Sequence, residues 1–187
     1  RLHTGGLTTN IERQLRGHLR VLDKVFSSPA IPQSLEQIRP DCYANIHVFA
    51  AARFYAVGHI PEAIRNLERA AELLPDDANS GAMLEKLLRF RSSPTVSLDH
   101  EAYKRVVLDN LPTGFRKKSV LRGLARIEAA QLFEACKQQD WPKVRRLWPK
   151  VISQDIRWLG NIGLWSIMVE SVVGSHFAGR LRCLCQR

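Results

Sequence analysis

The chain has 187 residues, of which 45% are hydrophobic and 25% charged. This composition is typical of a globular domain and excludes a disordered chain. The formal net charge of +10 favours an anionic partner, either nucleic acid or a membrane surface. Four Cys in a chain of this size do not make the dense disulfide framework of small secreted domains, so we expect a reduced, cytoplasmic protein.

Helical periodicity runs through almost every segment and sustained strand alternation is missing from the sequence, which predicts an all-α fold. The first helix is expected to begin at Thr9, because Thr9 and Glu12 have the spacing of a capping box. It should end at Phe26, after which Ser and Pro residues cluster. A short helical turn over Leu35–Ile38 should follow, stopped by Pro40.

The next two helices are expected to pack as a pair. Asp41 is placed to cap a helix that runs to Val57, and Gly58 then breaks the helix. Pro61 suits the first turn of a second helix, which should end just before Pro75.

This pair of helices resembles a tetratricopeptide (TPR) repeat. The residues that carry the resemblance are Phe54-Tyr55-Ala56-Val57-Gly58-His59-Ile60-Pro61-Glu62-Ala63-Ile64, followed by Leu67, Ala70, Leu73 and Pro75. In such a repeat Gly58 permits the turn, the small Ala63 lets the paired helices approach, and Ala70 leaves room for a neighbouring repeat.

A degenerate second copy is expected over Glu134–Asp155, with Val144 and Val151 at the positions of the small residues. The other predicted helices are Ala82–Phe90, Asp99–Leu111, Phe115–Gln138, Ile156–Val173 and a short tail helix from about Ser175. The TPR resemblance implies antiparallel helical hairpins in a right-handed array over residues 11–187. A subdivision near residues 92–94 is left open.

The most apolar stretch, residues 158–169, contains twelve uncharged residues, fewer than the ~20 that a helix needs to span a bilayer. We therefore expect a buried core helix and not a membrane anchor. All four tryptophans fall at core-like helical positions instead of forming an exposed platform for stacking bases, so nucleic-acid binding is not favoured.

The sequence carries no complete enzyme signature. The sequence lacks a phosphate-binding glycine loop, a zinc-binding His pair and a nucleophile elbow. Cys183 and Cys185 have no second pair of metal ligands, so a basic tail helix is favoured there over a metal site. We expect no catalytic residue, metal or cofactor within this chain.

The first ten residues, Arg1-Leu2-His3-Thr4-Gly5-Gly6-Leu7-Thr8-Thr9-Asn10, resemble the Arg-x-His-x-x-x-x-Ser/Thr segment that closes the catalytic domain of inverting family 2 glycosyltransferases. The resemblance implies that residues 1–10 are the tail end of an upstream catalytic domain. It also implies that Arg1 and His3 lie near the diphosphate of a nucleotide-sugar donor and its divalent metal. A cation and an imidazole there would offset the charge that develops on the leaving diphosphate.

Basic residues gather where acidic ones are missing, between Asp109 and Glu128. The predicted contacts to an anionic surface or phosphate are Arg116, Lys117, Lys118, Arg122 and Arg126. A basic amphipathic helix of this kind can lie on anionic lipid, but a solvated helix face is the favoured interpretation. Two further basic clusters follow, over residues 143–150 and 180–187.

Two functions stay open from the sequence. The leading one is an accessory C-terminal helical domain of a bacterial family 2 glycosyltransferase. Such a domain would position the enzyme's own upstream catalytic domain or a partner protein, in the cytoplasm or at the inner face of the membrane. The alternative is a free-standing TPR-like module that binds a peptide or protein without sugar chemistry. A nucleic-acid-binding helical protein is a weaker third interpretation.

Overall fold

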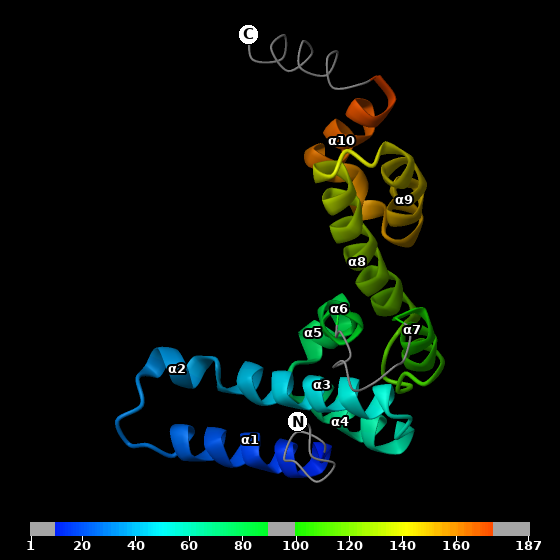
Figure 1. Ribbon diagram of the computed structural model, residues 1–187. Coiled ribbons are helices and arrows are strands. Elements are labelled where there is room, and N and C mark those ends of the chain that lie inside the picture. The colour runs from blue at the N-terminus through cyan, green and yellow to red at the C-terminus, as the bar shows by residue number, and fades with distance from the viewer. Residues whose placement is uncertain (1–9, 90–99, 174–187) are drawn as a thin grey trace, which may run out of the picture. The chain divides into compact units, whose positions relative to one another are not determined.

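The computed structural model describes residues 10–89 and 100–173, and all regular structure within these ranges is helical (Figure 1). The prediction of an all-α fold is therefore confirmed. The chain forms two compact units, Arg1–Arg116 and Lys117–Arg187. The subdivision expected near residues 92–94 and the tail helix expected from Ser175 fall outside the described residues, so both stay predictions.

Unit 1 contains seven helices within its described residues. They are α1 (Ile11–Phe26), α2 (Gln33–Gln37), α3 (Arg39–Ala56), α4 (Ile60–Leu73), α5 (Pro75–Ser80), α6 (Ala82–Leu88) and α7 (His100–Asp109). Helix α3 is central, because it packs against α1, α4, α6 and α7. Eight of its residues are buried: Ala44, Val48, Ala50, Ala51, Ala52, Phe54, Tyr55 and Ala56.

Two helix starts differ from the sequence predictions. The N-cap of α1 is Asn10 and not Thr9, because the Asn10 side chain accepts the backbone N–H of Arg13 at 2.9 Å. Helix α3 begins at Arg39 and places Pro40 in its first turn, where the missing N–H of proline costs nothing. Pro40 therefore starts a helix instead of stopping one. Asp41 lies inside the first turn of α3 and is not its cap.

Two buried tyrosines, one on α3 and one on α7, donate hydrogen bonds to backbone carbonyl groups of other segments in unit 1. The Tyr55 hydroxyl donates to the carbonyl oxygen of Asn110 at 2.7 Å, and the Tyr103 hydroxyl donates to that of Leu87 at 2.9 Å. Burial raises the pKa of Tyr55 to about 12, with a smaller contribution from the charge of Glu68. Both hydroxyls are therefore neutral hydrogen-bond donors at physiological pH.

Unit 2 contains α8 (Lys117–Lys137), α9 (Trp141–Gln154), the 3₁₀ helix η1 (Ile156–Gly160) and α10 (Ile162–Val173). Helix α9 packs against α8, η1 and α10. The core of this unit consists of Ala129, Leu132, Ala135, Val144, Leu147, Val151 and Leu164. The single helix predicted over Ile156–Val173 is divided at Asn161, whose side chain accepts the backbone N–H of Leu164 at 3.1 Å and so begins α10.

Candidate functional site

The turns that follow α3 and α8 have the same backbone geometry. Gly58 has φ +79° and Gln139 has φ +58°, both in the left-handed region. After α3, the N–H of Gly58 donates to Tyr55 and that of His59 to Phe54. After α8, the corresponding N–H groups of Gln139 and Asp140 donate to Cys136 and Ala135. These two pairs of bonds define a Schellman motif at each helix end.

The helices that follow these turns also correspond. Each carries a proline in its first turn, Pro61 in α4 and Pro142 in α9. Ala63 and Ala70 of α4 are fully buried, and so are Val144 and Val151 at the corresponding places of α9. The segments α3–α4 and α8–α9, both predicted from the sequence to be TPR-like, therefore share three features. These are a Schellman motif at the end of the first helix, a proline in the first turn of the second helix, and two fully buried positions on that second helix.

A polar chain of side chains joins α3 to α4. Nδ1 of His47 lies 2.9 Å from Oδ1 of Asn66, and Nδ2 of Asn66 donates to the carbonyl oxygen of Glu62 at 2.8 Å. Because Oδ1 of Asn66 can only accept, His47 donates from Nδ1. The His47 imidazole therefore links α3 to α4 through this hydrogen bond.

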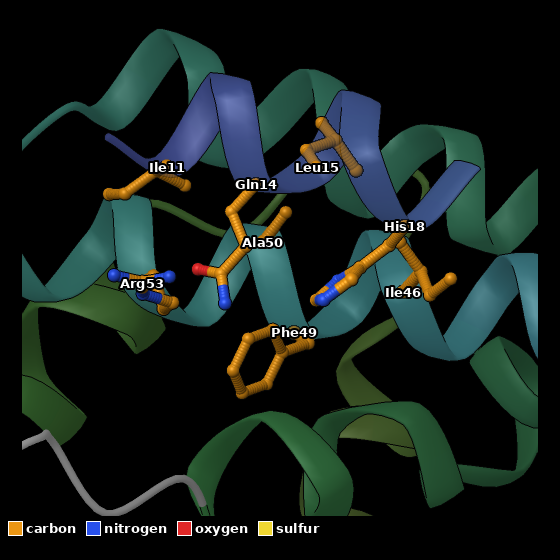
Figure 2. A pocket seen from close by; sticks show the side chains of 8 residues that line it. All are labelled: Ile11, Gln14, Leu15, His18, Ile46, Phe49, Ala50 and Arg53. Carbon is orange, nitrogen blue, oxygen red and sulfur yellow. The ribbon is translucent and has the colours of Figure 1, made fainter. Parts of the chain in front are cut away.

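A small cavity lies between α1 and α3, and Figure 2 shows Gln14 and His18 reaching into it from α1. Its volume of about 10 Å³ is close to the minimum for one water molecule. On the α3 side, the guanidinium of Arg53 lies 5.9 Å from the ring centre of Phe49, and burial lowers the pKa of Arg53. Such a cavity is too small for a nucleotide-sugar or a cofactor.

The basic residues predicted to contact an anion lie at and near the start of α8. Arg116 directly precedes the helix, and the others lie within it: Lys117, Lys118, Arg122 and Arg126. Arg116, Lys117 and Lys118 are exposed, while Arg122 and Arg126 are half-buried within α8. The expected row of contacts is thus unevenly accessible, and its role stays a prediction. Arg1 and His3 lie outside the described residues.

The charge is distributed unequally between the two units. In the described residues of unit 1, thirteen Lys and Arg face twelve Asp and Glu. Residues 117–173 of unit 2 carry ten Lys and Arg against five Asp and Glu. The second unit is therefore the strongly basic part of the described chain.

The apolar stretch at residues 158–169 is not a buried core helix, so that prediction is wrong. Only Leu164 of this stretch is fully buried. We call the exposed apolar side chains of η1 and α10 the α10 face. It comprises Ile156 (71% exposed), Leu159 (39%), Ile162 (85%), Trp165 (38%) and Val172 (66%).

The tryptophans of unit 2 only partly follow the prediction that they pack in the core. Trp141, Trp148 and Trp158 are partly buried and pack against the core of unit 2. Trp165 is on the α10 face, where its ring meets that of Trp148 edge-on at 5.4 Å and its Nε1–H donates to the carbonyl oxygen of Leu159. Sequence periodicity could not predict the exposure of Trp165, because an apolar helix has the same residue pattern whether or not other elements cover it.

Within the described part of the chain, no cluster of three or more His, Cys, Asp or Glu side chains is arranged to hold a metal ion. No helix among those residues is long and apolar enough to cross a membrane. No family model, curated protein or solved structure matches the chain.

Proposed function

We propose that the chain is a helical module without a catalytic site, built around two TPR-like pairs in which the helices run antiparallel. The pairs are α3–α4 and α8–α9. The observation that carries this proposal is their shared Schellman turn, followed by a proline start and two fully buried inward positions. TPR-like pairs are units of interaction and positioning, because stacked pairs present extended surfaces to partners.

The parent protein, in this proposal, is a family 2 glycosyltransferase whose catalytic domain ends at about Asn10. The support is the resemblance of residues 1–10 to the segment that closes such domains. Arg1 and His3 would then lie beside the diphosphate of the nucleotide-sugar donor, and the helices after Asn10 would position the catalytic domain or its partner.

The gene upstream of Arg1 and a transfer assay test this origin together. We expect the reading frame to continue upstream through strand–helix alternation and an Asp-x-Asp metal motif. The full product should transfer sugar from a nucleotide-sugar donor, and residues 1–187 alone should not. Arg1→Ala or His3→Ala in the full product should lower turnover, whereas Arg13→Ala, in the exposed first turn of α1, is the matched control. A start codon immediately before Arg1 would refute the glycosyltransferase origin.

The rival proposal is a free-standing TPR-like module that binds a peptide or protein. It is favoured by the exposure of Phe49, which is 42% accessible on the central helix α3 with a guanidinium over its ring. This rival keeps the same fold and predicts no transfer by any product of the gene. The transfer assay on the full product therefore separates the two proposals.

A further inference from the structure

Helix α1 keeps one side exposed, and this side carries apolar residues. The helix that packs against α1 is α3, and Figure 1 shows the two side by side. Of the sixteen residues of α1, Phe26 is the one that is buried. Val21 is 61% exposed and Val25 is 45% exposed. Their spacing of four residues places them next to each other on the same side of the helix.

Gly17 lies on this exposed side, one turn before Val21, and the local fold does not require a glycine there. It is not among the residues with positive φ, and a Cβ added to it would meet no heavy atom within 4 Å among the described residues. Glycine is also a poorer helix former than alanine. What glycine does permit is the close approach of another backbone. Gly17 therefore leaves room for the main chain of a partner to pass close to α1.

Two cations lie beside the exposed valines. Arg20 and Lys24 each directly precede one of them, and both are exposed. Neither forms an ion pair with another described residue. The acidic side chains of α1 are already engaged elsewhere: Glu12 pairs with a cation one turn along the helix at 3.9 Å, and Asp23 accepts the Tyr43 hydroxyl at 2.6 Å. The complementary surface is therefore apolar and carries carboxylates.

Gln14 favours a protein over a lipid as the partner. Its side chain reaches into the small cavity between α1 and α3 (Figure 2), and its Oε1 is buried without a hydrogen-bond partner in the described structure. A buried acceptor needs a hydrogen-bond donor. A polar side chain of a protein supplies one, whereas a lipid acyl chain does not. Gln14 is also a surface neighbour of Gly17, because residues three positions apart lie side by side on a helix.

We propose that the exposed side of α1 binds an acidic amphipathic helix of a partner protein. The partner helix crosses α1 at Gly17 and places its apolar side chains on Val21 and Val25. Its carboxylates face Arg20 and Lys24, which sets its preference for an acidic sequence. A second copy of the chain fits less well, because α1 itself carries four Lys and Arg against two acidic residues.

This inference rests on the proposed function of the chain as an interaction module and adds the chemistry of its partner. Sugar transfer by the full product does not involve this side of α1. Failure of the partner helix to bind would therefore refute the inference and leave the proposed glycosyltransferase origin to its own assay.

The test is fluorescence anisotropy of a labelled amphipathic peptide helix of about 18 residues, long enough to span α1. The peptide carries Leu on one face and Glu on the other, and a second peptide has Lys in place of every Glu. The whole chain is titrated into each. Wild type should bind the acidic peptide at least about tenfold more tightly than the basic one, and added salt should weaken that preference.

The first variant, Val21→Ser with Val25→Ser, removes the exposed apolar side chains of α1. It should lose roughly tenfold of the affinity for the acidic peptide, since both side chains are buried in the complex. The matched control is Ile162→Ser with Val172→Ser, which alters two exposed side chains of the α10 face. This control should bind as wild type does.

Two further variants test the charge and the glycine. Arg20→Glu with Lys24→Glu should abolish the preference for the acidic peptide. Its control, Arg145→Glu with Arg146→Glu, makes the same change in net charge at exposed positions of α9 and should keep the preference. Gly17→Gln should weaken binding although glutamine is the better helix former. Urea unfolding of each variant separates a loss of binding from a loss of folding.

The proposal is overturned if wild type binds the two peptides equally or binds neither. It is also overturned if the folded variants of α1 bind the acidic peptide as wild type does. Binding of wild type to vesicles containing phosphatidylglycerol, lost in the double Ser variant of α1, would assign this side of α1 to a membrane instead. A dimer of wild type that Gly17→Gln abolishes would assign it to a second copy of the chain.

Discussion

Replacing Gly58 by Ala isolates the backbone cost of the turn between α3 and α4. The φ of +79° is in the left-handed region, where a residue with a Cβ lowers the free energy of unfolding by roughly 1–2 kcal/mol. A Cβ added at Gly58 would meet no heavy atom within 4 Å among the described residues, so steric overlap adds nothing. Ala also lowers the conformational entropy of the unfolded chain, which offsets the destabilisation by roughly 0.4–1 kcal/mol. The net expectation is a loss of about 1 kcal/mol in the free energy of unfolding.

Gly17→Ala supplies the matched control, because it adds the same methyl group within the same unit. Gly17 lies inside α1, has open space around its Cα in the described structure, and is not among the glycines with positive φ. Ala is the better helix former by about 1 kcal/mol, so this variant should be stabilised. In urea, with a slope of about 2 kcal/mol per molar, the midpoint should fall by roughly 0.5 M for Gly58→Ala. For Gly17→Ala it should rise by a similar amount.

Urea unfolding of the full chain, followed by circular dichroism at 222 nm, measures both shifts in the same transition. The reasoning is refuted if Gly58→Ala is as stable as wild type, or if both variants move the midpoint in the same direction. The first result would mean that the turn does not hold a left-handed residue. The second would mean that the added methyl group, and not the backbone conformation, determines the effect.

Two other predictions follow from the same structure. Gln139→Gly should stabilise unit 2 by roughly 0.5–1 kcal/mol, because Gln139 holds φ +58° and glycine adopts it freely. Thermal unfolding measures this change, and a lower melting temperature would contradict it. The free energy of unfolding should fall as the pH rises above 10, because Tyr55 has a folded pKa of about 12 against an ordinary 10. Above pH 12 the total loss in the free energy of unfolding is on the order of 3 kcal/mol. Urea midpoints from pH 8 to 11.5 measure it, and Tyr55→Phe, which has no group to ionise, should show a shallower decline.

Turn chemistry is the part of the fold that the sequence predicted best. Gly58 and Pro61 restrict the backbone wherever they occur, so their effect is local and can be recognised without a structure. The turn at Gln139 was found by its spacing to Pro142, although Gln is a poor residue for a left-handed position. Helix starts were less predictable, since Thr9 and Asn10 are both good N-caps and only the structure shows which side chain accepts the bond.

The surface of the molecule was the part that the sequence could not predict. Val57 and Phe49 have the spacing of an inward stripe, yet they are 45% and 42% exposed. The buried side of α3 is instead determined by several neighbouring helices, which no local pattern encodes. The basic run after Asp109 shows the same limitation. Exposed Lys118 and half-buried Arg122 are indistinguishable in sequence, because burial depends on elements far along the chain.

The apolar stretch at residues 158–169 shows why hydrophobicity alone does not locate a core. A helix that is apolar all round needs cover on two sides, and in the described part of unit 2 α9 and η1 are the elements that pack against α10. A small unit has little interior, since a domain of about 60 residues buries only about 60% of the surface its unfolded chain exposes. Leu164 accordingly enters the core while Ile162 stays 85% exposed, so the apolar residues of α10 exceed what folding uses. That excess of apolar side chains is the physical reason why the α10 face stays exposed instead of joining the core.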